Sequence, residues 1–309
     1  MVEDNKSYFS NGKLLLSGEY AVLDGATAFA LPVKHGQTLE IKETTNTNTL
    51  VWEAYVLNRL WFSAHFDTDT LKIKNTNNNL IAERLKKIIL SVIKLNPNFK
   101  NKLNSKIVTN LDFNRDWGLG SSSTLISNIA YWSNINPFKL FHTIYDGSGY
   151  DIAAARISKP FLYTSKKDLT PIIEERDFEN EFLNSIFFVH LGKKQNSNLE
   201  IDSYRKQNKL THKQISEISN ISTLFAQCKT LKEFQTLMFN HEQIVSKIIN
   251  KPTVKTELFS DFEGSIKSLG AWGGDFIMAV SQNDSNYVEN YFSNKKLNTI
   301  FNYKQLAIK

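Results

Sequence analysis

Apolar residues recur at every third or fourth position over residues 80–95, and charged side chains occupy most of the positions between them. That spacing places one apolar stripe along a helix, so this segment is predicted to be an amphipathic helix that ends at Asn96-Pro97. The second half of the chain shows the same kind of pattern. Helices are expected there over residues 198–208, 212–228, 231–249, 255–269 and 287–292.

Short apolar runs bounded by glycine or polar turns predict strands in the rest of the chain. A strand beginning at Lys13 turns at Ser17-Gly18 and leads to a short apolar piece that Asp24-Gly25 closes. The acidic segment 174–181 is the expected connection between two domains, residues 1–184 and 185–309. Further strands are expected over residues 26–33, 37–42, 50–55, 106–111, 160–163, 186–191 and 276–281, with a strand-like tail over 299–308.

A glycine- and serine-rich loop joins the strand at 106–111 to an apolar helical stretch, residues 125–132. Gly118-Leu119-Gly120 is followed by Ser121-Ser122-Ser123-Thr124. Serine is favoured as an N-cap, so the pattern predicts a tight loop that ends on a serine-capped helix. The N–H groups and the dipole at such a helix start suit an anion, above all a phosphate. An ordinary capped helix after a glycine turn is the alternative.

A second glycine turn, Asp146-Gly147-Ser148-Gly149, follows a short helix predicted over residues 136–145. Asp151 then stands in the first turn of an alanine-rich helix. The run of alanines allows that helix to pack closely against a neighbour.

Composition narrows the class of protein. The chain has 309 residues, of which 41% are hydrophobic and 22% charged, which predicts a globular protein of two domains. The net charge of +6 favours small anionic ligands, but the basic residues are scattered, so nucleic-acid binding is not expected. One cysteine, Cys228, excludes an intrachain disulfide and a thiolate metal cluster. No apolar run approaches the roughly 18 residues that span a membrane, so a cytoplasmic protein is expected.

Four motifs occur in an order that resembles the GHMP small-molecule kinase superfamily, which includes galactokinase, homoserine kinase, mevalonate kinase and phosphomevalonate kinase. The resemblance covers nearly the whole chain and is closest to mevalonate and phosphomevalonate kinases. It implies an α/β (α+β) fold with an N-terminal ribosomal-S5-like domain, a C-terminal α/β domain and an active site in the cleft between them. The motifs are Lys13 with Gly18-Glu19-Tyr20, the loop at 118–123, Gly147-Ser148-Gly149-Tyr150-Asp151 and Lys267 to Asp275.

The resemblance also implies a role for each motif. Asp151 would be the general base, and Lys13 would supply the positive charge beside it, because this loop lacks the lysine of a Walker A motif. Ser122, or else Ser121, would ligate Mg²⁺, and Glu19 would support the substrate pocket, although an exposed structural glutamate is the alternative. The ATP triphosphate would bind to Gly118, Leu119, Gly120, Ser121, Ser122 and Ser123. The loop that closes over the site would be Gly270, Ala271, Trp272, Gly273 and Gly274.

The chain departs from the family pattern at several positions. Trp272 stands where the family loop has glycine, so its ring must either stack on a ligand or fill an enlarged gap. The glutamate that mevalonate kinases place upstream of the aspartate is absent, and Asp146 is one substitute. Phosphomevalonate kinases also tend to lack that glutamate.

The sequence therefore predicts an ATP- and Mg²⁺-dependent kinase that phosphorylates mevalonate or phosphomevalonate, as a monomer or homodimer. Lys193, Lys194 and Arg156 are candidates for binding the anionic substrate. Two alternatives stay open: a catalytically inactive relative that binds a ligand or partner, and an enzyme similar to diphosphomevalonate decarboxylase.

Overall fold

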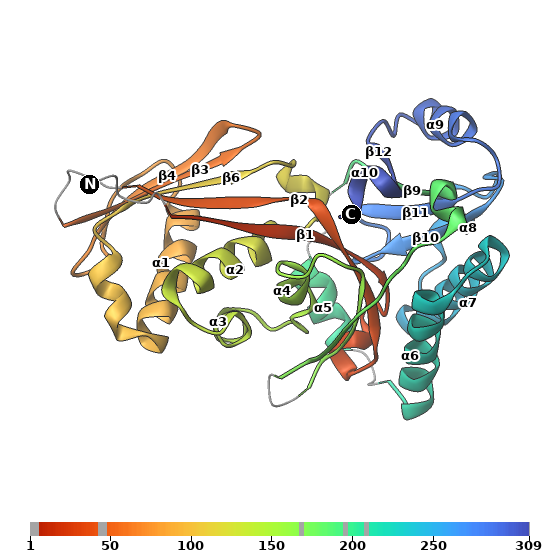
Figure 1. The fold of residues 1–309 in the computed structure, drawn as a ribbon, viewed down its shortest axis with the longest axis horizontal. Helices are drawn as coiled ribbons and strands as arrows, with labels where there is room; N and C mark the ends of the chain where they lie inside the picture. The colour runs from red at the N-terminus through yellow and green to blue at the C-terminus, as the bar shows by residue number, and fades with distance from the viewer. Residues whose placement is uncertain (1–5, 43–47, 167–169, 194–196, 207–209, 309) are drawn as a thin grey trace. The chain divides into compact units, whose positions relative to one another are not determined.

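The computed structural model describes residues 6–42, 48–166, 170–193, 197–206 and 210–308. The chain divides into two compact units, and each contains a sheet with helices (Figure 1). Unit 1 consists of Met1–Gly12, His35–Arg115 and Leu119–Arg156. Unit 2 consists of Lys13–Lys34, Asp116–Gly118 and Ile157–Lys309. Strands β1 (Ser7–Ser17) and β2 (Ala28–Lys42) contribute residues to both units.

The sheet of unit 1 has the strand order β5-β4-β3-β6-β2, in which β3 and β6 are parallel and the other neighbours antiparallel. Helices α1, α2 and α3 cover one side of it (Figure 1). The strands are β3 (Thr49–Val56), β4 (Arg59–Asp67), β5 (Ile73–Thr76) and β6 (Lys106–Leu111). The helices are α1 (Asn79–Leu95), α2 (Ser121–Ser133), α3 (Pro137–Ile144) and α4 (Tyr150–Ala154), with 3-10 turns at Pro97–Lys102 and Arg115–Trp117.

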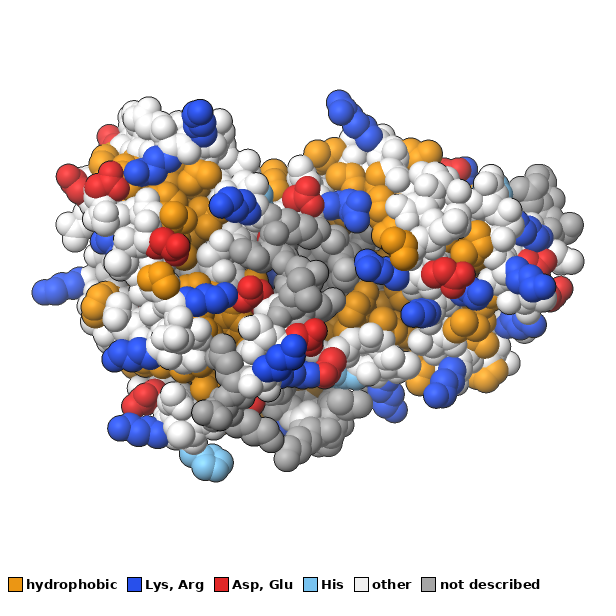
Figure 2. Space-filling model, turned by 180° about the vertical axis from the view of Figure 1, so that it is seen from behind, with side chains coloured by type: hydrophobic (Ala, Val, Ile, Leu, Met, Phe, Trp, Pro, Cys, Tyr) orange, Lys and Arg blue, Asp and Glu red, His pale blue; other side chains and the backbone are white. Residues whose placement is uncertain are grey.

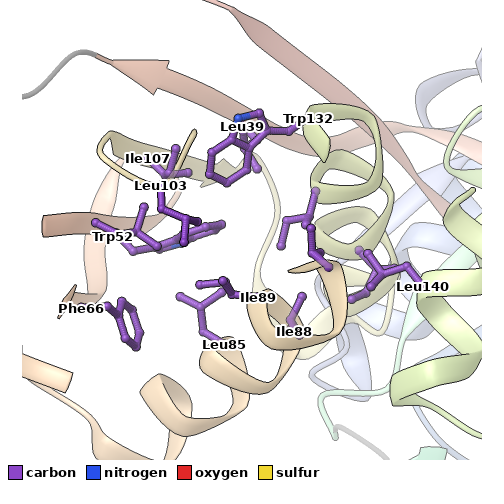
Figure 3. Packing of buried hydrophobic residues seen from close by; sticks show 14 of the residues in the cluster. Leu39, Trp52, Phe66, Leu85, Ile88, Ile89, Leu103, Ile107, Trp132 and Leu140 are labelled. Atoms are coloured by element: carbon purple, nitrogen blue, oxygen red, sulfur yellow. The ribbon is translucent and has the colours of Figure 1, made fainter. Parts of the chain in front are cut away.

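The core of unit 1 lies between the sheet and these helices. Figure 3 shows Trp52 and Ile107 from the sheet beside Ile89 of α1 and Trp132 of α2. The ring of Phe99 meets the Trp132 ring edge-on, with the centroids 4.6 Å apart. This packing fixes α2 against the sheet, and with it the loop that begins α2.

Unit 2 contains a sheet of order β10-β11-β9-β12, in which all neighbours are antiparallel. Val288 and Phe292 of α9 pack in one apolar cluster with residues of β9, β10 and β11, and α7 contacts β10. The first part of β2 pairs with β7, which pairs with β8. The strands are β7 (Phe161–Thr164), β8 (Ile172–Glu175), β9 (Ile186–His190), β10 (Ser265–Leu269), β11 (Phe276–Val280) and β12 (Ile300–Asn302). The helices are α5 (Ser197–Arg205), α6 (His212–Gln227), α7 (Leu231–Ile249), α8 (Val254–Leu258), α9 (Ser285–Asn294) and α10 (Tyr303–Leu306), with 3-10 turns at Ala21–Asp24 and Glu181–Ser185.

Most of the predicted elements are confirmed, including α1, α3, α7, β3 and β6, and three predictions are wrong. Residues 255–269 do not form one helix, because Ser265–Leu269 pair with β11 as a strand. The strands expected at 26–33 and 37–42 are one continuous strand, β2. Residues 303–306 of the predicted strand-like tail are helical, with a capping box at Asn302.

No helix within the described ranges has the length and apolar character needed to cross a membrane.

Candidate active site

The glycine and serine loop begins helix α2, and its cap differs from the prediction. Gly120 is the N-cap, in the left-handed conformation (φ 92°), and no side chain caps the helix. The expected serine cap is therefore wrong, because Ser121 is already helical and the backbone at Gly120 takes a conformation that glycine adopts without strain. The first N–H groups of an α-helix lack partners within the helix, so the start of α2 can donate to an anion.

The hydroxyl groups after Gly120 have different surroundings. Ser123 is buried, and its hydroxyl donates to the Gly120 carbonyl at 2.9 Å. Thr124 is also buried and donates to Gln37 Oε1 at 2.9 Å. Ser122 is exposed, and its hydroxyl forms a hydrogen bond with Tyr145. Of these three, Ser122 is therefore the hydroxyl placed to meet a ligand.

Asp151 is the second residue of α4, whose N-cap is Gly149. Asp151 therefore does not occupy the N-cap position of its helix. Its Oδ1 accepts the N–H of Ile152 at 3.1 Å, and the residue is half-buried. A carboxylate at this position is stabilised by the helix dipole.

Tyr145, which follows α3, contacts the start of α2 within unit 1. Its hydroxyl bonds to Ser122, and burial raises its pKa, while Ser122 and Arg84 lower it and Asp151 adds to the rise. Burial also lowers the pKa of His142, an effect that the Asp151 charge opposes. Helix α2 packs against α4. Ser122 and Asp151 therefore begin two neighbouring helices of unit 1, and the charges of Asp151 and Arg84 act on Tyr145.

Sequence reasoning missed Tyr145, His142 and Arg84. Tyr145 and His142 lie in and after a short amphipathic helix, where an aromatic residue is ordinarily part of the core. Arg84 is on the polar face of α1, as most exposed basic residues of such a helix are. No local pattern marks any of them.

Lys13 and Gly118 lie together within unit 2. The Lys13 ammonium donates to the Gly118 carbonyl at 2.8 Å. The Asp275 side chain approaches Gly118 so closely that an added Cβ would lie 1.9 Å from Asp275 Oδ2. Gly118 also has φ 66°, so both its conformation and its surroundings require glycine. Lys13 is thus bonded to the glycine loop at Gly118, whereas the resemblance implies a place for it beside Asp151, a residue of unit 1. Asp275 is a neighbour of Gly118 that the sequence did not identify.

Glu19 is buried, with 1% of its surface exposed, so the alternative of an exposed structural glutamate is wrong. Its Oε1 accepts a hydrogen bond from Lys267, which is buried in β10. Burial raises the pKa of Glu19, and Lys267 opposes that rise. Sequence analysis gave Lys267 no role, because a helix was predicted over residues 255–269 and a lysine in it is expected on the polar face.

The indole of Trp272 fills a gap in the core of unit 2. Only 4% of the residue is exposed, and it packs in a cluster with Tyr20, Tyr204, Val245 and Ile249. The indole N–H donates to the carbonyl of Pro252 at 2.9 Å. Of the two roles left open for this ring, filling a gap is the one that its packing supports.

Three residues outside the motifs, Arg156, Lys193 and Lys194, were predicted to bind the anionic substrate, and their surroundings differ. Arg156 donates to Ser127 through Nε and a terminal nitrogen, both at 2.7 Å, and lies over the Tyr131 ring. Its guanidinium is therefore engaged in holding the structure. Lys193 is exposed, and Lys194 lies outside the described residues.

The described residues contain no group of three or more His, Cys, Asp or Glu side chains that could hold a metal ion. Mg²⁺ usually binds through one or two protein groups together with substrate phosphates and water, so the exposed Ser122 hydroxyl fits an ion that arrives with a nucleotide.

Lys and Arg side chains are interspersed with Asp and Glu on the face shown in Figure 2, with no continuous basic patch.

Comparisons with known proteins identify the fold. No protein-family model matches the chain, and no curated protein sequence does. Solved structures match along its length. Mevalonate kinase of Methanococcus jannaschii is 19% identical, with a TM-score of 0.68 and coverage of 100% of both chains. Streptococcus pneumoniae phosphomevalonate kinase, solved with phosphomevalonate and AMPPNP, is 15% identical, with a TM-score of 0.72 and coverage of 96% and 99%.

Mevalonate diphosphate decarboxylase of Staphylococcus aureus also matches, with 11% identity, a TM-score of 0.63 and coverage of 97% and 96%. These proteins are all members of the GHMP superfamily. The chain therefore has the mixed α/β fold of the two-domain GHMP kinases over its full length, and the predicted fold class is confirmed.

Proposed function

We propose that this protein is an ATP-dependent small-molecule kinase of the GHMP superfamily whose acceptor is mevalonate or phosphomevalonate. The observation that carries the proposal is the placement of Ser122 and Asp151 within unit 1. They stand at the starts of α2 and α4, two helices that pack together, and Ser122 bonds to Tyr145. A helix start that can bind polyphosphate next to a carboxylate is the arrangement that phosphoryl transfer to an alcohol needs.

The loop Gly118 to Ser123 would hold the triphosphate on backbone N–H groups at the start of α2. Lys13 would contribute positive charge through its attachment to Gly118. Mg²⁺, held by Ser122 and by the nucleotide, would neutralise charge on the phosphates. Catalysis of phosphoryl transfer depends mainly on such positioning and charge neutralisation.

In the proposed reaction, the acceptor oxygen forms a bond to the γ-phosphorus of ATP. The bond from the γ-phosphorus to the bridging oxygen breaks, and ADP leaves with the electron pair of that bond. Asp151 takes the proton when the acceptor is a hydroxyl, as it is in mevalonate. A phosphate oxygen, as in phosphomevalonate, is already ionised at neutral pH, so Asp151 would then orient the acceptor.

The substrate class is inferred from two supports. Among the similar folds are mevalonate kinase and phosphomevalonate kinase. The net charge of +6 is compatible with an anionic acceptor. The decarboxylase fold match and the inactive alternative each predict a different product pattern, so one experiment separates all of them.

The test is to incubate the purified chain with ATP, Mg²⁺ and each acceptor, and to follow the products by phosphorus NMR. Mevalonate should yield a new phosphomonoester, and phosphomevalonate a diphosphate. With mevalonate as the acceptor, Asp151→Asn should lower the rate by at least about a hundredfold, since general-base catalysis contributes about 10²–10⁴. Asp69→Asn, in the turn between β4 and β5, is the matched control and should leave the rate unchanged.

Absence of both products at high enzyme concentration would refute the substrate assignment. Release of CO₂ from diphosphomevalonate would instead favour a decarboxylase. Binding of a ligand without turnover, unaffected by Asp151→Asn, would favour the inactive relative.

A further inference from the structure

A cluster of charged and polar side chains is buried in unit 2, next to the glycine loop at Gly270–Gly274. Glu19, His241, Glu242, Lys267 and Ser268 are each at most 2% exposed. Glu19 follows β1, the histidine and Glu242 are in α7, and Lys267 and Ser268 are in β10. Charged side chains are almost never fully buried unless they are paired, so this cluster requires an explanation.

Lys267 is at the centre of the cluster. Its ammonium donates to Glu19 Oε1 and, at 2.8 Å, to the Ser268 carbonyl. It lies 4.0 Å from Glu242 Oε1, and that oxygen accepts the Ser268 N–H at 3.2 Å. Lys267 therefore connects the segment after β1, helix α7 and the end of β10.

The cluster contains one ammonium and two carboxyl groups. Burial raises the pKa of Glu242 to about 8, while Lys267 opposes the rise and Glu19 adds to it. Burial also holds the pKa of His241 well below its ordinary value, and its Nε2 accepts the Gly18 N–H at 2.9 Å. Lys267 and Glu19 therefore form an ion pair, Glu19 Oε2 lies 3.2 Å from His241 Nε2, and burial favours the neutral forms of Glu242 and His241.

The segment after β1, Glu19-Tyr20, forms hydrogen bonds with the glycine loop at two residues. The Glu19 carboxylate accepts the N–H of Gly270, and the Tyr20 hydroxyl accepts the N–H of Trp272 at 3.0 Å. Tyr20 has φ 60°, an uncommon backbone conformation for a residue with a side chain. Such strain persists only where the surrounding contacts impose it, and it is common at functional sites.

The cluster is poorly built for stability alone. Among the described residues, four of its buried atoms have no hydrogen-bond partner: Glu19 Oε2, His241 Nδ1, Glu242 Oε2 and Ser268 Oγ. Buried polar atoms without partners cost free energy, and a buried ion pair often contributes less to stability than apolar residues of the same size. Its contacts instead hold backbone groups of Gly18, Ser268 and Gly270 in place.

We propose that Lys267 is a positioning residue that, through Glu19, holds the Gly270–Gly274 loop in one conformation. The loop is then a fixed wall rather than a lid. That the wall borders the substrate rests on the proposed function, but the rigidity of the loop does not. This position is consistent with the burial of Trp272, which attaches the middle of the loop to the core.

The test is site-resolved amide hydrogen exchange on the full chain, for the wild type, Lys267→Met and Glu19→Gln. The readouts are the amides of Gly270 and Trp272, compared with those of β11. Lys255→Met is the matched control. Its ammonium also donates to a backbone carbonyl, that of Gly264, at the opposite end of β10.

Lys267→Met is expected to speed exchange at Gly270 and Trp272 by about tenfold or more, with less than about twofold change in β11. Glu19→Gln keeps an oxygen that can accept the Gly270 N–H but removes the carboxylate charge. Exchange at the Gly270 amide is therefore expected to be about fivefold faster than in the wild type. Glu19→Gln also leaves Glu242 able to ionise beside Lys267, so this variant should fold. Lys255→Met should leave both loop amides as in the wild type. Unchanged loop exchange in Glu19→Gln and Lys267→Met, or a parallel rise in the loop and β11, would overturn the proposal.

Kinetics give a second readout if the kinase reaction is found. A displaced wall weakens substrate binding, so Glu19→Gln should raise KM by about fivefold or more and change kcat by less than about twofold. A loss of kcat with unchanged KM would overturn the positioning role. If no phosphoryl transfer is found with any acceptor, the proposed function fails, while the exchange experiment still decides whether Lys267 holds the loop.

Discussion

The Glu242 carboxyl should make the stability of unit 2 depend on pH. This side chain is buried in α7, and burial raises its pKa from 4.5 to about 8. Glu242→Gln removes the titration and keeps an oxygen that can accept the Ser268 N–H. The comparison of this variant with the wild type therefore isolates the ionisation of one group.

The direction in which stability changes with pH follows from the number of protons that the folded and unfolded chains bind. Between pH 4.5 and about 8 the folded protein keeps the Glu242 proton and the unfolded chain does not, so stability falls as the pH rises through this range. Each pH unit costs about 1.4 kcal/mol, which gives about 5 kcal/mol over the whole range. His241 acts in the opposite sense, because its pKa is lowered on folding, and its contribution is lost as the pH falls below about 6.5. The effect of Glu242 is therefore measured most clearly between pH 6.5 and 8. Over this range its titration should lower the free energy of unfolding by about 2 kcal/mol.

The assay is urea unfolding of the wild type and Glu242→Gln at half-unit steps from pH 6 to 9, followed by tryptophan fluorescence. The difference in unfolding free energy should change by about 2 kcal/mol in favour of the variant between pH 6.5 and 8, and then level off. Parallel curves for the two proteins across this window would refute the charge state assigned to the cluster. Glu257→Gln, in the exposed part of α8, is a control that should follow the wild type.

Three further predictions concern single contacts. Tyr145→Phe removes the hydroxyl that bonds to Ser122, so the apparent affinity for ATP-Mg²⁺ should fall by about 3–10-fold in a nucleotide titration, and equal affinity would exclude a role for that contact. Trp272→Phe removes the indole hydrogen bond to Pro252 and leaves a gap in the core. The variant should be less stable by about 1–3 kcal/mol in urea unfolding. An unchanged free energy of unfolding would argue against the packing role of the ring. Ile89→Ala should destabilise unit 1 by about 2–5 kcal/mol, whereas Leu80→Ala, on an exposed residue of the same helix, should cost less than about 1 kcal/mol, and similar losses would contradict the assigned core.

The elements that sequence analysis predicted well are those whose pattern is local. Helix α1 has one apolar stripe and a clear stop at Asn96-Pro97, and both appear in the structure. The start of α4 was predicted because glycine, aspartate and alanine follow one another directly. Strand β4 was missed although Phe62, Ala64 and Phe66 alternate on its buried face, because Leu60 and Trp61 interrupt the alternation with apolar residues on both faces.

The contacts that sequence analysis could not predict join distant segments. Lys267 and Glu19 are 248 positions apart, and neither lies in a pattern that indicates the other. Residues 265–269 have a spacing compatible with a helix, and only pairing with β11 decides that they form a strand. Tyr145 likewise meets Ser122 because α2 and α3 pack together, which is a property of the tertiary structure.

The central claim is that the start of α2 binds a nucleotide polyphosphate beside the carboxylate of Asp151. The most direct measurement is a crystal structure of the chain with Mg²⁺ and a non-hydrolysable ATP analogue. Phosphate oxygens are expected within hydrogen-bond distance of the N–H groups of Ser121–Ser123, with Ser122 Oγ at the metal. A nucleotide bound elsewhere, or protein side chains covering the start of α2, would contradict this claim.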